Sequence, residues 1–193
     1  MRKVKIKRKT AETDIDMALN LDSFKPAKIQ TDIPFLNHML NLFAANAQIT
    51  LDIKAKGDIE IDDHHLTEDI GITLGQALKK ALGDKKGITR YGHFLLPMDE
   101  ALAYVAMDIS GRPHLSYDVK IKFQKTGFNY DLLQEFFIAF VNNAGITLHI
   151  KMMKGRNNHH IAEAVFKGFG RALKDAVSIN KKIKSIPSTK GIL

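Results

Sequence analysis

The sequence predicts an α+β fold in which one strand–strand–helix–strand–helix unit occurs twice, with the helices packed on one face of each sheet. Two repeats carry this prediction. The pattern Asn-Ala-x-Ile-Thr-Leu-x-Ile-Lys at residues 46–54 returns at residues 143–151, 97 positions later. A His-His-x-x-Glu motif followed by apolar residues at helical spacing begins at His64 and again at His159, 95 positions later. The chain is therefore interpreted as two tandem copies of one unit, and the order of its helices argues against a doubly wound parallel sheet.

The first copy is expected at residues 1–93 and the second at residues 94–193, and the halves are expected to form a single intertwined functional domain. In the first half, polar and apolar side chains alternate in two segments, which predicts antiparallel strands joined near residues 10–13. Pro34 and the apolar residues that follow at helical spacing predict a helix. The predicted elements are strands at 2–8 and 15–21, a helix at 35–45, strands at 49–54 and 59–61, and a helix at 65–82 that ends at Gly83.

In the second half, residues 87–97 are expected to link the two copies. A turn with the sequence Ser-Gly-Arg-Pro at residues 110–113 separates two predicted strands. The predicted elements are strands at 101–109 and 115–123, a helix at 131–142, a strand at 146–152, a helix at 159–177, and a short polar tail at 186–191.

The composition of the 193 residues is typical of a soluble globular chain. No apolar run approaches the length of a membrane span and no signal-peptide core follows the charged start, so we expect a cytoplasmic protein. The chain contains no cysteine, so any metal ion must be bound by nitrogen and oxygen atoms. Its net charge of +8 comes from dispersed lysines that are not interleaved with aromatic residues, which favours a small anionic substrate over nucleic acid.

The repeated His-His-x-x-Glu motif predicts metal binding. In each copy the second histidine and the glutamate are three residues apart and share one helical face, a spacing typical of metal ligands. Imidazole and carboxylate groups suit manganese, iron or zinc. Because adjacent side chains diverge, the two histidines of one motif are expected to bind different ions, which predicts two ions between the two motifs. The candidate ligands are His64, His65, Glu68, His159, His160 and Glu163.

The helix upstream of each motif supplies further candidate ligands. The 97-residue offset aligns His38 with Glu135, and both stand just before apolar helical residues. With them, each ion would have about four protein ligands and keep open positions for a substrate. His149 falls in a strand, and we interpret it as a support for a ligand or a structural residue, with direct ligation as the alternative. His93 and His114 have no matched partners and are interpreted as surface or structural residues.

A series of short motifs runs along nearly the whole chain, at residues 8–13, 35–40, 62–69, 90–92, 97–102, 110–113, 147–149, 158–163 and 187–191. In this order and at these separations they resemble the imidazoleglycerol-phosphate dehydratase family. The resemblance implies a hydro-lyase that converts D-erythro-imidazole glycerol phosphate to imidazole acetol phosphate and water in histidine biosynthesis. It also implies two Mn²⁺ ions, or other divalent metals, per active site. A homo-oligomer of 24 subunits built from trimers, with sites at subunit interfaces, is implied as well.

The resemblance also implies roles for single residues. Glu12, in the predicted turn between the first two strands, matches the acid/base glutamate that contacts the substrate. Asn37 stands where many members have Asp, and Glu135 stands where some have His. The positions that hold the substrate or its phosphate are matched by Glu12, Arg90, Arg112, Lys167, Ser188 and Lys190, so the C-terminal tail is expected to contact the substrate.

The reaction requires removal of a hydrogen from a carbon beside an imidazole ring, with no carbonyl group to acidify it. We hypothesise that a metal on the ring nitrogen stabilises an imidazolate, so that the proton and then hydroxide leave through a diazafulvene-type species. Glu12 is the hypothesised proton-transfer group, with a metal-bound water as its rival. The alternative functions are a metal-dependent storage or assembly protein, a di-metal hydrolase of phosphorylated small molecules and, from charge alone, a nucleic-acid binder.

Overall fold

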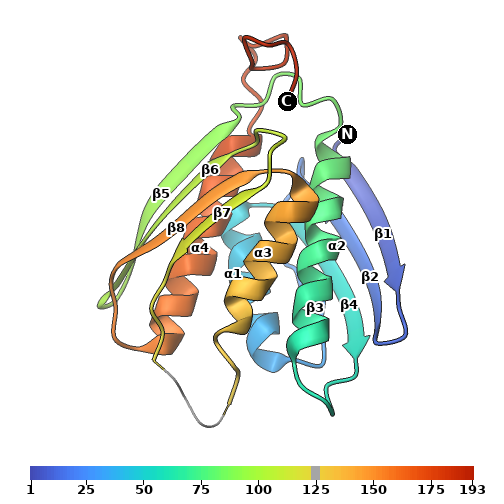
Figure 1. The fold of residues 1–193 in the computed structure, drawn as a ribbon. Coiled ribbons are helices and arrows are strands. Elements are labelled where there is room, and N and C mark those ends of the chain that lie inside the picture. The colour runs from blue at the N-terminus through green and yellow to red at the C-terminus, as the bar shows by residue number, and fades with distance from the viewer. Residues whose placement is uncertain (123–126) are drawn as a thin grey trace.

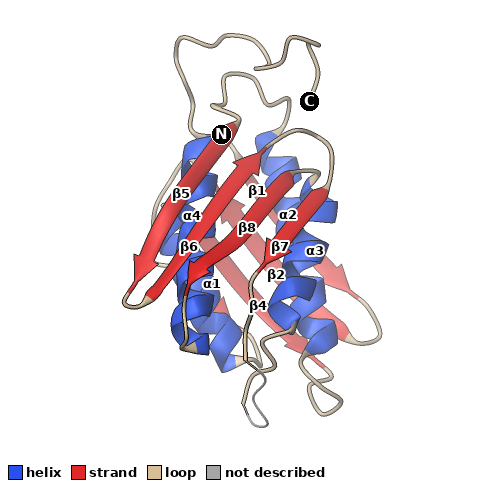
Figure 2. Cartoon of the chain, turned by 60° about the vertical axis from the view of Figure 1, so that its left-hand side comes forward, coloured by secondary structure: helices blue, strands red, loops and turns tan. Residues whose placement is uncertain are grey.

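The computed structural model describes residues 1–122 and 127–193, and it places a layer of helices between two four-stranded sheets (Figure 1; Figure 2). The predicted α+β fold with an internal duplication is confirmed. The first half contains β1 (Lys3–Lys9), β2 (Thr13–Asn20), β3 (Lys28–Gln30), α1 (Pro34–Ala47), β4 (Thr50–Gly57) and α2 (His64–Leu82). The second half contains β5 (Tyr91–Met98), β6 (Ala101–Asp108), β7 (His114–Asp118), α3 (Leu132–Ala144), β8 (Thr147–Lys154) and α4 (Asn158–Val177).

Both sheets have the same strand order and the same mixture of strand directions. The first runs β1-β2-β4-β3 and the second β5-β6-β8-β7. In each sheet the last pair is parallel and the other pairs are antiparallel. On β2, Ile15, Met17 and Leu19 are buried, whereas the residues between them face outward. The alternation that predicts the strands is therefore the alternation that buries one face of each sheet against the helices.

The helices of the two halves are exchanged. The second helix of each half packs on the first helix of the other half, α2 on α3 and α4 on α1 (Figure 1). Two glycines at equivalent positions of the repeat permit these crossings. A Cβ atom at Gly75 would lie 2.5 Å from the carbonyl oxygen of Phe140, and one at Gly170 would lie 2.5 Å from that of Phe43, which is too close for any other residue. The exchange joins both halves in one core and brings the start of α4 beside α1.

Each half contains one strand that the sequence does not predict, β3 in the first and β5 in the second. The prediction that residues 87–97 form only a linker is wrong, because most of them belong to β5. Pro97 is tolerated there because β5 is an edge strand. Gly92 is required because a Cβ atom would collide with the carbonyl oxygen of Ala172. Residue 93, taken as the boundary between the halves, lies inside this strand.

The predicted strand at residues 59–61 is wrong, since these residues form a turn in which the Ile61 N–H donates to the carbonyl oxygen of Asp58 at 2.9 Å. Ile61 is 67% exposed, so its apolar character does not reflect burial in a sheet. The strand predicted at 115–123 corresponds to β7, which ends at Asp118, and residue 123 lies outside the described residues. Within the described ranges, none of the helices has the length and apolar character that crossing a membrane requires.

Candidate metal centre

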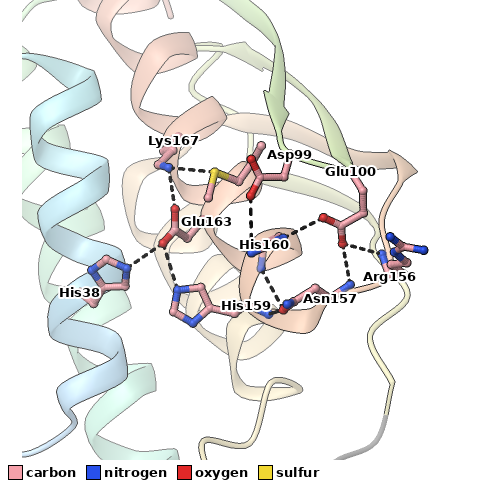
Figure 3. Close-up of polar contacts among 10 residues, drawn as sticks. His38, Asp99, Glu100, Arg156, Asn157, His159, His160, Glu163 and Lys167 are labelled. Atoms are coloured by element: carbon pink, nitrogen blue, oxygen red, sulfur yellow. Dashed lines mark hydrogen bonds and ion pairs between the residues drawn. The ribbon is translucent and has the colours of Figure 1, made fainter.

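One compact cluster of candidate metal ligands lies between the two halves (Figure 3). His38 comes from α1, whereas His159 and Glu163 come from the first two turns of α4. The Nε2 atoms of both histidines face the same carboxylate oxygen of Glu163, at 2.8 Å from His38 and 3.0 Å from His159. One ligand atom of each residue lies within 4.8 Å of the others. Two imidazoles and a carboxylate at this spacing are suited to a divalent ion.

The start of α4 is held by a helix cap. The side-chain oxygen of Asn157 accepts the backbone N–H groups of His159 at 2.9 Å and His160 at 3.4 Å, two groups that the helix start leaves without partners. The four-residue spacing then puts His159 and Glu163 on one face. The structure thus pairs Glu163 with the first histidine of the motif, not with the second as the three-residue spacing predicts.

Glu163 is the electrostatic centre of the cluster, and it is only 7% exposed. Burial raises its pKa, but hydrogen bonds from Lys167, His38 and His159 lower it by more and leave the pKa at about 2. Lys167 Nζ lies 2.5 Å from the second carboxylate oxygen, which the histidines do not contact. The side chain is therefore an anion that only accepts hydrogen bonds, as a metal ligand must be.

The second histidine of this motif faces a different carboxylate (Figure 3). His160 Nδ1 lies 2.7 Å from Glu100, and its Nε2 lies 3.7 Å from Asp99. The hydrogen bond to Glu100 raises the pKa of His160. The same bond, together with the backbone N–H of Asn157 at 2.8 Å, lowers the pKa of Glu100 to about 2. His159 and His160 thus have separate partners, in the manner expected if each serves a different ion.

The motif of the first half is more open. His64 Nε2 lies 3.9 Å from Glu68, and both side chains are substantially exposed. His65 Nδ1 lies 3.0 Å from Asp58, a hydrogen bond that raises the pKa of His65. Its Nε2 lies 3.9 Å from Glu12, which is half exposed. Glu12, in the β1–β2 turn, therefore lies beside the second histidine of the first motif, and its carboxylate is open to solvent.

Within residues 1–122 and 127–193, His38, His159 and Glu163 are the one group of three whose ligand atoms converge. The other predicted ligands, His64, His65, Glu68, Glu135 and His160, are not part of it within one chain. His149 is exposed on the outer face of β8, with its ring centre 5.6 Å from that of His114. His93 is exposed on β5, 6.5 Å from Tyr104 by the same measure.

Apart from Glu12, the predicted substrate-binding residues divide into two groups. Lys167 lies at the cluster, whereas Arg90 lies near the last turn of α4 with the C-terminal tail, which contains Ser188 and Lys190. Arg112 follows Gly111, which lies against the backbone of Leu193 at the end of this tail. Figure 1 shows the tail beyond the C-terminal end of α4. The Arg90 N–H donates to the carbonyl oxygen of Ala176, near the last turn of this helix. Its guanidinium group binds Asp108 at 2.7 and 3.2 Å and donates to the carbonyl oxygen of Pro187 at 2.9 Å, which ties the tail to the sheet.

Sequence reasoning misses Asp58 and Glu100, the acceptors for His65 and His160. No repeat marks them, because Asp58 follows β4 whereas Glu100 lies between β5 and β6. One signal does exist for Glu100. It immediately precedes the second strand of its half, as Glu12 does in the first half, so the strand pairing aligns the two glutamates.

The fold and the cluster define a duplicated α+β protein with a centre suited to a divalent metal. The sequence model of the family described as imidazoleglycerol-phosphate dehydratase matches residues 31–173. The imidazoleglycerol-phosphate dehydratase of Endomicrobium trichonymphae is 67% identical, with all of this chain and 98% of the relative covered. That of Trichodesmium erythraeum is 55% identical, covering all of this chain and 92% of the relative. The chain belongs to the imidazoleglycerol-phosphate dehydratase family, whose members are hydro-lyases.

Two solved structures agree with this assignment. The crystal structure of the Staphylococcus aureus imidazoleglycerol-phosphate dehydratase has a TM-score of 0.84 at 44% identity, and the match covers 92% of this chain and 99% of that one. The Pyrococcus furiosus enzyme, solved in complex with (S)-C348, has a TM-score of 0.85 at 41% identity, with 97% and 100% covered. The likeness therefore extends over the entire duplicated unit.

Because the folded-state pKa of Glu163 lies at about 2, below its ordinary 4.5, its ionised contacts stabilise the fold above pH 4.5. This stabilisation is lost as the pH falls from about 4.5 to about 2. We expect Glu163→Gln to reduce the pH dependence of the unfolding free energy of metal-free protein over this window, by up to about 3 kcal/mol. Denaturant unfolding at a series of pH values measures it. Glu68→Gln, in the open motif, is the matched control, and equal slopes for the wild type and Glu163→Gln would contradict the assignment.

Proposed function

We propose that the chain is the hydro-lyase that converts imidazole glycerol phosphate to imidazole acetol phosphate and water in histidine biosynthesis. The observation that carries the proposal is the convergence of His38, His159 and Glu163 across the two halves. The relatives that match this chain over nearly their whole length are named imidazoleglycerol-phosphate dehydratase. Lys167, a cation next to the cluster, adds a group that can contact an anionic substrate.

We further propose two Mn²⁺ ions per active site, with other divalent metals as substitutes. The donors fit such an ion, because two imidazole nitrogens already face one anionic oxygen, and nitrogen and oxygen ligands suit manganese. His38, His159 and Glu163 would hold one ion. Ligands for the remaining coordination positions would come from His64, His65, Glu68, Glu135 and His160. When bound, the metal supplies Lewis-acid stabilisation of negative charge on the imidazole ring of the substrate.

The residues of the chain would handle protons and orientation. The hydroxyl group leaves the carbon that carries the ring, one proton leaves the next carbon so that water is lost, and the enol that remains becomes the ketone on that second carbon. Glu12 is the group we assign to this proton transfer, since it is half exposed and 3.9 Å from His65. The phosphate would be bound by Arg90, Arg112 and the C-terminal tail. The guanidinium group of an arginine can donate two hydrogen bonds to a phosphate.

We propose that a neighbouring copy completes each site in a 24-subunit assembly built from trimers. In one chain the phosphate-binding residues near Ala176 lie about 20 Å along α4 from Glu163, at about 1.5 Å per residue. A substrate with one ring, three carbons and a phosphate is too short for this span. The tail end of one copy placed against the cluster of another would close the gap.

Light scattering of the purified chain is expected to give the mass of 24 chains of 21.6 kDa each. Removal of the tail residues should raise KM without changing the metal content, since the tail belongs to the phosphate end. An active monomer would contradict a site shared between copies.

Turnover of imidazole glycerol phosphate by chelator-stripped protein is expected only after Mn²⁺ is added, with the ketone as product and no free phosphate. The ketone and inorganic phosphate are to be measured in the same sample, because a di-metal hydrolase would release phosphate instead. No ketone under either condition, from protein that still binds metal, would reject the dehydratase assignment.

Replacement of the proposed proton-transfer group by Glu12→Gln should lower kcat by about 10²- to 10⁴-fold and leave Mn²⁺ affinity unchanged. Steady-state kinetics and a metal titration on the same preparation measure both effects. The matched control is Asp14→Asn, a surface carboxylate on the same hairpin that pairs with Lys9 at 3.3 Å. If kcat stays within a few-fold of the wild type, a water molecule at the metal takes the role instead.

A further inference from the structure

His65 and His160, the second histidines of the two motifs, share an arrangement that the repeat does not explain. In each ring the Nδ1 atom contacts a carboxylate, Asp58 at 3.0 Å or Glu100 at 2.7 Å. The Nε2 atoms have no acceptor within hydrogen-bond distance among the described residues, since the nearest carboxylate oxygens, of Glu12 and Asp99, are 3.9 and 3.7 Å away. A neutral imidazole that donates from Nδ1 has its lone pair on Nε2.

The two carboxylates come from different places in the repeated unit. Asp58 directly follows β4, where the second half has Gly155 directly after β8. Gly155 cannot be replaced by a similar acid without rearrangement, because a Cβ atom there would lie 2.6 Å from Cγ1 of the buried Ile161. In the second half the acceptor comes instead from the β5–β6 turn, as Glu100. Simple duplication of one ancestral contact would have put both acceptors at equivalent positions.

We infer that Asp58 and Glu100 are positioning residues: each holds the Nδ1–H of one histidine, so that Nε2 of His65 or His160 is free to bind a divalent metal ion. The inference rests on the metal centre proposed above and extends it from the ligands to the residues that orient them. Carboxylates that accept the second N–H of a metal-binding histidine fix both the tautomer and the ring orientation.

The arrangement also distinguishes Glu12 from Glu100, which occupy equivalent positions in the two halves. Glu100 is engaged by His160 and by the backbone N–H groups of Asn157 and Arg156 at 2.8 and 3.3 Å. Glu12 is the equivalent residue in the first half, but there the histidine of the motif, His65, contacts Asp58 instead. The carboxylate of Glu12 therefore stays half exposed, where a substrate can reach it. Asp58 thus accounts for why only one half has a free glutamate at this turn.

The test is the affinity of metal-free, full-length protein for Mn²⁺, measured by competition with a chromophoric chelator. Asp58→Asn and Glu100→Gln should each weaken binding by about 10- to 100-fold. Both changes keep the size of the side chain, and the Gln oxygen can still accept the N–H of Asn157. Glu60→Gln, an exposed acid on the same loop as Asp58, is the matched control and should bind like the wild type. Wild-type affinity in both positioning variants overturns the inference.

A second measurement keeps the inference testable if a variant fails to fold. The ¹⁵N solid-state NMR spectrum of histidine-labelled, metal-free wild type should show His65 and His160 as neutral rings protonated at Nδ1, above the pH at which they are charged. His65→Gln and His160→Gln assign the two signals. Protonation at Nε2 in both rings would overturn the inference.

A different experimental result would show that the proposed metal centre itself is wrong. Wild-type protein that binds no Mn²⁺ would reject both the proposed centre and this inference. Wild-type binding that is unchanged by Asp58→Asn and Glu100→Gln would reject the inference alone. A purely structural role for the two acids would lower the unfolding temperature and leave Mn²⁺ affinity and the tautomers as they are.

Discussion

Gly170 allows α4 to cross α1 with no side chain between the two backbones, and the candidate centre depends on this contact. His38 belongs to the first half and Glu163 to the second, so their 2.8 Å contact exists only because the halves exchange helix partners. Gly75 makes the equivalent crossing of α2 over α3. The stacked rings of Phe43 and Phe169, 4.6 Å apart, fill the core beside the α1–α4 crossing. The crossing of α4 over α1 therefore determines both the packing of the core and the positions of the candidate ligands.

The electrostatics of the centre follow from the same geometry. A carboxylate as buried as Glu163 would tend to be protonated, but three donors from both halves keep it ionised. An ionised acceptor surrounded by imidazole nitrogens is a site for a cation, and Lys167 takes the oxygen that the histidines leave. In the reaction that we propose, negative charge would develop on the imidazole ring of the substrate, and a cation at this site would stabilise it. The three candidate ligands are thus held together by contacts within the chain itself.

Duplication gave the two halves the same fold and motif, and the side chains around the motif have since diverged. Glu12 and Glu100 occupy equivalent turns, but one is open to solvent and the other is bound by His160. The candidate ligands differ as well, because Glu135 stands where the first half has His38. Arg90 and the tail form the end of the second half that we propose to bind phosphate. Divergence of this kind places different side chains around the same motif in the two halves, so that the halves can have different roles.

Sequence patterns alone were sufficient for the duplication, most strands and helices, and the candidate ligands His38, His159 and Glu163. Period-2 alternation, helical spacing and the repeat offsets are local or self-comparing signals, which a single chain displays directly. They failed at β5, because an edge strand tolerates Pro97 and uses Gly92 for close packing, and at 59–61, where exposed isoleucines imitate a strand. Tertiary structure alone decided that Glu163 meets His38 and that Glu100 holds the ring of His160. Those contacts join segments far apart in the chain, and their distances are set by how the helices cross, which no local spacing encodes.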